Sequence, residues 1–171
     1  MKRLLLAAAL TLLTATSAMA QTVVLVRHAE KADQSADPVL SEAGQVRAAA
    51  LAEAVAPLQI DTVFVTPLQR TRLTAEPAAE AAHLTPTVIA FEGGTPAHVA
   101  AVAARIRELP KTAKVLVVGH SNTIPLITRA LGVEAADMAD CEYDRLTTVI
   151  LGDGDTAVVL NSRYGAASTC E

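Results

Sequence analysis

The chain has 171 residues, of which 51% are hydrophobic and 2% aromatic, and its formal net charge is −4. This length suits one domain with a substantial hydrophobic core. Nucleic-acid binding requires basic tracks and aromatic stacking platforms, which an acidic chain with so few aromatic side chains lacks, so we expect no nucleic-acid partner.

The first 20 residues are predicted to be a secretory signal peptide. Met1-Lys2-Arg3 is a positive start, an apolar run follows over 4–13, and Ala18-Met19-Ala20 is the small-residue end after which cleavage is expected. The apolar run is too short to cross a bilayer, so no membrane span is expected. We therefore expect a periplasmic or secreted protein whose residues 21–171 form a single domain. Without Lys2 and Arg3, 12 basic side chains face 18 acidic ones, and the formal charge becomes −6.

Strand-like and helical patterns alternate along the rest of the chain. Short apolar runs predict strands over 23–26, 61–65, 87–90 and 114–118, and helical spacing of apolar residues predicts helices after each of them. Two further runs, 146–151 and 156–160, predict a hairpin at a sheet edge. This order predicts an α/β fold, a three-layer α/β/α sandwich with a mostly parallel central sheet and an edge hairpin.

The helix starts carry recognisable caps. Ser41 is a good N-cap for a helix that is expected to bury Val46, Ala50, Leu51, Ala54, Val55 and Leu58. Thr66 and Pro67 are expected to open the next helix, with threonine as the cap and proline at the first position. The third helix is expected to begin at Thr95 or Pro96 and to end before Pro110.

Two of the predicted strands end in histidine. The first leads into Arg27-His28 and the fourth into Gly119-His120. Because the carboxyl ends of parallel strands lie at one edge of a sheet, both histidines can converge there with Arg70, from the first turn of the helix after 61–65. Arginine binds oxyanions through two parallel hydrogen bonds, and histidine can be a neutral nucleophile near pH 7. The sequence thus predicts a phosphate pocket on an acidic protein.

Four segments in this order resemble the histidine phosphatase superfamily, the phosphoglycerate mutase-like fold. Leu25-Val26-Arg27-His28-Ala29-Glu30 is similar to its nucleophile motif, and Leu40-Ser41-Glu42-Ala43-Gly44 to the start of its first helix. The stretch 66–75, Thr-Pro-Leu-Gln-Arg-Thr-Arg-Leu-Thr-Ala, resembles its Ser-Pro-Leu-x-Arg-x-x-x-Thr-Ala element, and 117–121, Val-Val-Gly-His-Ser, its second histidine motif. The resemblance covers nearly all of 21–171, which it implies to be a histidine phosphatase domain.

The resemblance implies a metal-independent phosphoric monoester hydrolase that needs no cofactor. His28 would form a phosphohistidine that water then hydrolyses, while Arg27, Arg70 and His120 bind the phosphoryl oxygens. Positioned arginine and histidine neutralise those oxygens, and the same positive charge keeps His28 uncharged. No metal site is expected, because the four histidines lack ligand spacing.

The proton donor is less well defined by the motifs. Ser121 follows His120 where the acid-phosphatase branch has an aspartate, which disfavours that branch. In the mutase-like branch the acid comes from a loop after the third strand, where Glu92 lies. A carboxyl group held partly protonated there could donate to the leaving oxygen. An exposed loop glutamate with no catalytic role is the alternative.

The expected partner is a small phosphorylated substrate or inorganic phosphate. Two alternatives to a phosphomonoester hydrolase stay open: a non-catalytic phosphate- or phosphosugar-binding module of the same fold, and a protein phosphohistidine phosphatase. Mutase activity is less expected, because its phosphorylated cofactor belongs to the cytoplasm.

The chain has two cysteines, Cys141 and Cys170. In an oxidising compartment a disulfide between them is expected, which would tie the C-terminal tail to the segment after the last helix. Two free thiols are the alternative. Neither cysteine has basic neighbours, so neither is expected to be catalytic.

Overall fold

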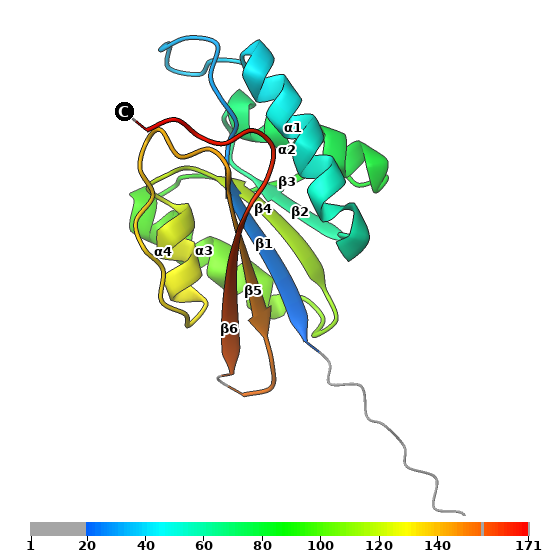
Figure 1. Ribbon diagram of the computed structural model, residues 1–171. Helices are drawn as coiled ribbons and strands as arrows, with labels where there is room; N and C mark the ends of the chain where they lie inside the picture. The colour runs from blue at the N-terminus through cyan, green and yellow to red at the C-terminus, as the bar shows by residue number, and fades with distance from the viewer. Residues whose placement is uncertain (1–19, 155, 171) are drawn as a thin grey trace, which may run out of the picture.

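A six-stranded sheet lies between two layers of helices in the computed structural model of the chain, which describes residues 20–154 and 156–170 (Figure 1). The strands are β1 Gln21–Arg27, β2 Thr62–Val65, β3 Thr87–Val88, β4 Lys114–Gly119, β5 Arg145–Leu151 and β6 Ala157–Arg163. The helices are α1 Glu42–Val55, the 3₁₀ turn η1 Ala56–Leu58, α2 Gln69–Ala81, α3 Gly94–Glu108 and α4 Ile124–Ala130.

The sheet has the strand order β3-β2-β4-β1-β5-β6. The four strands from β3 to β1 are parallel, while β5 runs antiparallel to β1 and pairs with β6 as a hairpin. The prediction of a mostly parallel sheet with an edge hairpin is confirmed. Because β1 and β4 are parallel neighbours at the centre of the sheet, their carboxyl ends lie side by side.

The alternation of side chains along β1 produces the two outer layers. Val23 and Leu25 belong to the hydrophobic core shared with α3 and α4. Val24 and Val26 point the other way, into the core shared with α1 and α2. Since successive strand residues face opposite sides, a run of four apolar residues requires a helix layer on both faces. The predicted three-layer sandwich is confirmed.

Helix α1 begins as predicted, but the face that it buries is only partly the predicted one. Ser41 is its N-cap, with the Gly44 N–H donating to Ser41 Oγ at 3.1 Å. Val46, expected in the core, is 66% exposed, whereas Arg47 is buried. The predictions for Val46 and for Ala54, which is also exposed, are therefore wrong, whereas Leu51 and Val55 are buried as expected. Apolar spacing could not show that Arg47 has a carboxylate partner, Glu30, at 2.7 Å.

Helix α2 begins later than predicted. Its first residue is Gln69, whose N–H donates to Asp37 Oδ1 at 2.8 Å. The predicted cap, Thr66, is wrong: its hydroxyl instead contacts Thr71 and His120. An aspartate distant in the sequence thus satisfies the helix start, and Pro67 lies outside the helix. Strand β3 is also shorter than the predicted 87–90, because only Phe64 and Val65 of β2 pair with it.

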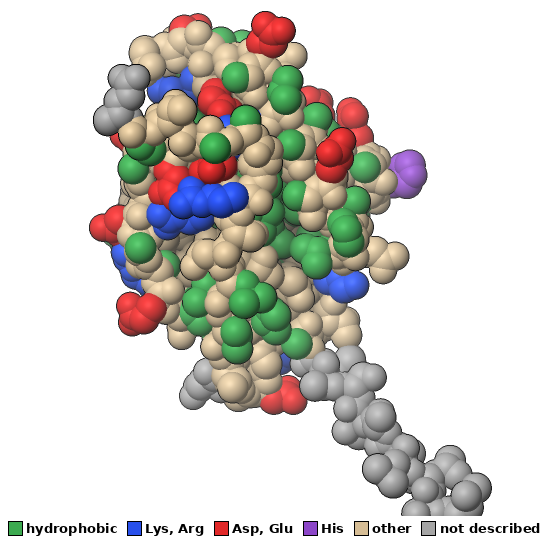
Figure 2. Space-filling model, viewed as in Figure 1, with side chains coloured by type: hydrophobic (Ala, Val, Ile, Leu, Met, Phe, Trp, Pro, Cys, Tyr) green, Lys and Arg blue, Asp and Glu red, His purple; other side chains and the backbone are tan. Residues whose placement is uncertain are grey.

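The β6 edge of the sheet is open to solvent. Val158 and Leu160 are 54% and 55% exposed, and hydrophobic side chains gather over this edge (Figure 2). Within 20–154 and 156–170, no helix has the length and apolar character needed to cross a membrane. The predicted signal peptide lies outside the described residues, apart from Ala20.

Candidate active site

The ends of β1 and β4 bring two buried histidines together. Arg27 pairs in register with Gly119, and the His28 N–H donates to the Gly119 carbonyl at 2.8 Å. The residues that follow, His28 and His120, are 4% and 7% exposed, and their ring centroids are 5.3 Å apart. The parallel register therefore places the imidazoles of His28 and His120 beside each other.

His28 is held in one tautomer by its own backbone. Its Nδ1 lies 2.8 Å from the carbonyl oxygen of Ala29, and because a carbonyl can only accept, Nδ1 carries the proton. The lone pair is then on Nε2. Burial, together with the charges of Arg27, Arg70 and Lys31, lowers the pKa of His28 to about 4. His28 is thus uncharged at neutral pH, mainly because it is buried.

His120 is uncharged for similar reasons. Burial, together with the nearby His28 and Arg70, lowers its pKa to about 3. Its Nε2 lies 3.2 Å from the hydroxyl of Thr66, a residue 1% exposed, so the ring orientation is fixed from the end of β2. The role of Thr66 was missed in the sequence, where it resembled a helix cap.

Arg70 lies in the first turn of α2 and directs positive charge toward both histidines, since it lowers the pKa of each. Its Nη1 lies 3.5 Å from the Ala36 carbonyl and 3.9 Å from the Asp37 carboxylate. Its Nε is buried and has no hydrogen-bond partner among the described residues. A buried donor of this kind favours an anionic ligand, because leaving it unpaired is unfavourable.

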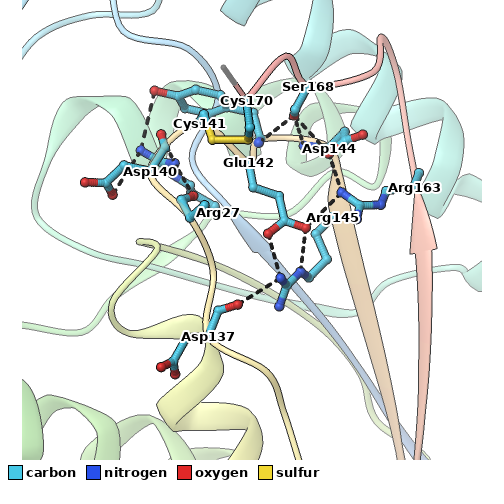
Figure 3. Close-up of a disulfide and its surroundings, with 12 residues drawn as sticks. Arg27, Asp137, Asp140, Cys141, Glu142, Asp144, Arg145, Arg163, Ser168 and Cys170 are labelled. Carbon is cyan, nitrogen blue, oxygen red and sulfur yellow. Dashed lines mark hydrogen bonds and ion pairs between the residues drawn. A yellow bond between two sulfur atoms is a disulfide. The ribbon is translucent and has the colours of Figure 1, made fainter.

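Arg27 is 4% exposed and lies under an irregular segment before β5. Its Nη1 donates to the carbonyls of Ala139 and Asp140, its Nη2 is 3.4 Å from the Tyr143 hydroxyl, and its guanidinium stacks 4.1 Å from the centre of the Tyr143 ring. Figure 3 shows Arg27 beside Asp140. Like Arg70, Arg27 has a buried Nε without a partner in the described part of the chain.

Sequence reasoning missed the segment that covers Arg27. Tyr143 also lies 6.1 Å from His28, measured between ring centroids, and Asp140 accepts a hydrogen bond from Ser121 at 2.6 Å. The pKa of Asp140 is lowered by this bond and by the charge of Arg27. The available signal was Cys141, whose predicted disulfide fixes this stretch.

Glu92 is exposed on the loop before α3. Its carboxylate makes no hydrogen bond or ion pair with a described residue. Its neighbour Phe91 stacks on His98 at 4.2 Å and lies 5.6 Å from His120, again between ring centroids, so the loop does border the histidine pair. The geometry thus brings His28, His120, Arg27 and Arg70 together and leaves Glu92 outside direct contact.

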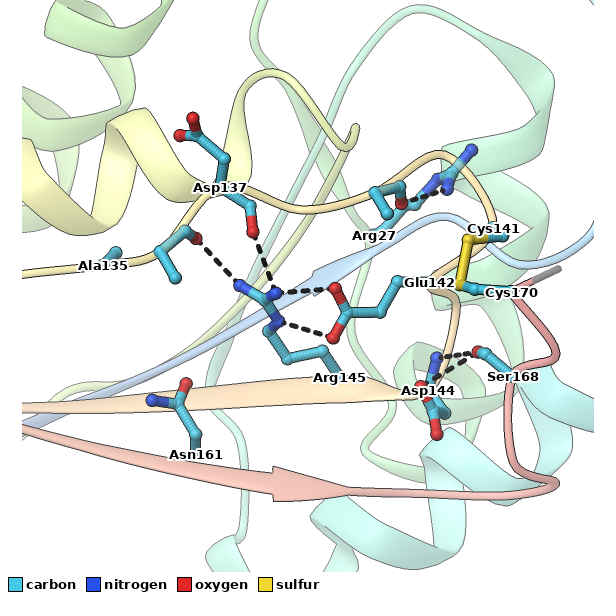
Figure 4. A network of polar contacts seen from close by, with 12 residues as sticks. Arg27, Ala135, Asp137, Cys141, Glu142, Asp144, Arg145, Asn161, Ser168 and Cys170 are labelled. Carbon is cyan, nitrogen blue, oxygen red and sulfur yellow. Dashed lines mark hydrogen bonds and ion pairs between the residues drawn. A yellow bond between two sulfur atoms is a disulfide. The ribbon is translucent and has the colours of Figure 1, made fainter.

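The predicted disulfide is confirmed. Cys141 and Cys170 are bonded, with Cα atoms 5.2 Å apart. Beneath it, Glu142 receives hydrogen bonds from both Arg145 Nε and Nη2, at 2.9 and 2.6 Å (Figure 4). Arg163 pairs with the same carboxylate at 2.8 Å. The described residues contain no group of three or more His, Cys, Asp or Glu side chains arranged to hold a metal ion.

The family model of the histidine phosphatase superfamily (branch 1) matches residues 23–90, which include His28 and Arg70. This match agrees with the predicted family over those residues. No curated protein matches the sequence significantly.

Several solved structures have the same fold as this chain. The protein histidine phosphatase SixA complexed with tungstate has a TM-score of 0.66 at 19% identity, covering 84% of this chain and 97% of its own. Mycobacterial hydrolase 1 has a TM-score of 0.65 at 16% identity, covering 87% and 100%. A mycobacterial glucosyl-3-phosphoglycerate phosphatase complexed with VO3 has a TM-score of 0.62 at 16% identity, covering 86% and 100%. The chain therefore shares the fold of these proteins along most of its length.

Proposed function

We propose that the protein is an exported phosphatase that hydrolyses phosphomonoesters through a phosphohistidine on His28. One observation carries the proposal. His28 is uncharged, its Nδ1–H donates a hydrogen bond to the Ala29 carbonyl, and its Nε2 is available as a nucleophile. Beside it lie Arg27 and Arg70, each with a buried and unpaired Nε in the described chain. A neutral nucleophile next to unsatisfied cationic donors suits transfer of a phosphoryl group.

In the first step Nε2 of His28 attacks phosphorus and the bond from phosphorus to the ester oxygen breaks. The ester oxygen leaves with the bonding electron pair and takes up a proton, for which Glu92 is the proposed donor. The Nδ1 hydrogen bond to Ala29 fixes the ring while Nε2 gains its bond. Phosphoryl transfer requires little other covalent chemistry from the protein, so catalysis depends mainly on positioning of the substrate and on electrostatic stabilisation.

Arg27, Arg70 and His120 are the proposed ligands of the equatorial oxygens. The arginines are permanently charged, and His120 enters the reaction uncharged because burial lowers its pKa to about 3. A bound phosphoryl dianion opposes that effect and favours the protonated ring. In the second step water attacks phosphorus and gives a proton to the Glu92 carboxylate, and the bond to Nε2 breaks. Inorganic phosphate then leaves, with His28 and the proton of Glu92 restored.

The related structures support an oxyanion pocket. SixA is described with tungstate and the glucosyl-3-phosphoglycerate phosphatase with VO3, both of which resemble a phosphoryl group in charge and shape. Export is supported by the Cys141–Cys170 disulfide, since such bonds persist in oxidising compartments.

The decisive experiment compares wild type with His28→Asn in the presence of EDTA, using p-nitrophenyl phosphate and a panel of alkyl and sugar phosphates. His83→Asn, at an exposed histidine, is the matched control. His28→Asn should reduce kcat/KM by about 1,000-fold or more, as expected on loss of a nucleophile, and the control should be unaffected. Wild type quenched in alkaline detergent, in which a phosphorus–nitrogen bond survives, should contain a phosphohistidine that His28→Asn lacks.

Other outcomes would redirect the assignment. Unchanged turnover in His28→Asn would contradict the nucleophile. Tight binding of phosphate without turnover of any ester would favour the non-catalytic binding module, and turnover of phosphohistidine proteins alone would favour a protein phosphohistidine phosphatase.

A further inference from the structure

Arg27 owes its orientation to one short stretch of chain, the segment 139–143. Its guanidinium donates to two carbonyls of that segment, lies 3.8 Å from the Asp140 carboxylate and stacks on the Tyr143 ring. All hydrogen bonds, the ion pair and the cation–π contact of the Arg27 side chain with described residues are made with this segment. The direction in which its remaining N–H groups point therefore depends on where the segment lies.

The segment 139–143 has no helix or strand of its own. It is held instead by the C-terminal tail, which also lacks regular structure. The disulfide joins Cys141, at the centre of the segment, to Cys170, and the N–H groups of Tyr143 and Asp144 donate to Ser168 Oγ at 2.8 and 3.0 Å. In Figure 3 the disulfide lies directly beside Arg27 and Asp140.

Besides the tail, the segment is anchored by Glu142, which pairs with Arg145 and Arg163, whereas Asp140 and Tyr143, which contact Arg27, are less enclosed. The Asp140 side chain is 91% exposed, Tyr143 is half-buried, and irregular surface stretches with few buried contacts open readily. Cys141 is half-buried and Cys170 exposed, so the bond is accessible to a dissolved reductant. These are the only cysteines of the chain, so a thiol reagent can act on this bond alone.

We propose that the Cys141–Cys170 disulfide is a positioning element for Arg27. With the bond closed, the segment 139–143 holds the guanidinium so that its buried Nε faces the phosphoryl group. With the bond open, the guanidinium must be ordered by the substrate itself, and phosphate binds more weakly. The inference rests on the proposed function in that Arg27 is taken as a phosphate ligand.

The test is a double-mutant cycle on phosphate affinity, measured by calorimetry with inorganic phosphate. The four proteins are wild type, Cys141→Ser/Cys170→Ser, Arg27→Met, and the combination. With Arg27 present, removing the disulfide should weaken phosphate binding about tenfold and raise KM correspondingly. A change of this size is within the range of measured coupling energies between residues. In the Arg27→Met background the same removal should change the affinity less than about twofold.

A second measurement avoids any new side chain. Dithiothreitol should weaken phosphate binding to wild type by the same factor, closing to its own cyclic disulfide as the two cysteine thiols form, and should leave Cys141→Ser/Cys170→Ser unchanged. All titrations are run well below the Tm of the least stable variant, so that a loss of stability alone does not alter affinity.

The outcomes separate the two proposals. An equal loss of affinity in both backgrounds, no loss, or tighter binding on reduction would overturn the positioning role, the last by showing that the segment competes with phosphate for Arg27. If the double-mutant cycle gives the expected affinities but the protein hydrolyses no ester, the proposed phosphatase activity is refuted and the positioning role of the disulfide stands. A wild type that binds no phosphate would overturn both.

Discussion

Arg47 donates hydrogen bonds from Nε and Nη2 to the carboxylate of Glu30, at 2.8 and 2.7 Å, two residues beyond His28. Its Nη1 continues to the carbonyl of Tyr164 at 3.0 Å. The side chains of Arg47 and Glu30 are 4% and 23% exposed. This ion pair links the loop after the nucleophile to α1 and to the C-terminal tail.

Arg47→Met should lower the free energy of unfolding by about 3 kcal/mol, because it leaves the Glu30 carboxylate poorly solvated and without its partner. Urea denaturation followed by circular dichroism measures the change. Arg72→Met, at an exposed position, should alter it by less than about 0.5 kcal/mol. The double variant Glu30→Gln/Arg47→Met should be more stable than the sum of its single effects. Simple additivity would show that the pair is not a unit.

Arg70→Lys should weaken phosphate binding about tenfold or more. A hydrogen bond to a charged group contributes about 1.5–3 kcal/mol, and lysine keeps the charge but cannot supply the buried Nε donor. Calorimetry with inorganic phosphate measures the affinity, and Arg105→Lys, on the exposed face of α3, is the control. An unaltered affinity would mean that the Arg70 guanidinium does not contact the bound phosphate.

Glu92→Gln should slow the hydrolysis of phosphate esters to an extent that depends on the leaving group. A proton donor assists the departure of an alkoxide, whereas p-nitrophenolate leaves without help, so kcat for alkyl phosphates should fall about 100-fold while p-nitrophenyl phosphate changes little. Asp140→Asn is the comparison, because Ser121 and Arg27 lower the pKa of Asp140 and keep it ionised. It should affect both substrates alike. Equal effects on both substrates in Glu92→Gln would remove Glu92 from the mechanism.

Stability should decline as the pH falls from about 6.5 toward 4. Burial lowers the pKa of His28 to about 4 and that of His120 to about 3, so the unfolded chain takes up protons in this window while the folded chain does not. The stability that these histidines contribute is complete above pH 6.5 and is lost on acidification. The Tm of wild type should therefore fall more steeply with pH than that of His28→Asn. Parallel curves would contradict a lowered pKa for His28.

Much of the fold could be predicted because local patterns determine it. Apolar runs of strand length required cover on both faces, and Ser41 capped its helix as expected. The errors have a common cause. Val46 and Thr66 were misjudged because Glu30 and His120, distant in the sequence, provide partners that no local pattern contains.

The candidate site divides in the same way. His28, His120 and Arg70 stand directly after strand ends or in a first helical turn, so topology alone brought them together. Tyr143 and Asp140 lie on an irregular segment whose path depends on a disulfide and on tail contacts. Sequence could predict the bond between the two cysteines but not the course of the chain around Arg27.

The order in which the chain is made differs from the order of the sheet. β1 is the first strand in the sequence, yet its neighbours in space are β4, at 114–119, and β5, at 145–151. Such distant pairing is slow to form, and the central strand stays without partners until most of the chain is present. His28 therefore meets His120 only late in folding, and any fragment that stops before β4 has a nucleophile motif without a pocket.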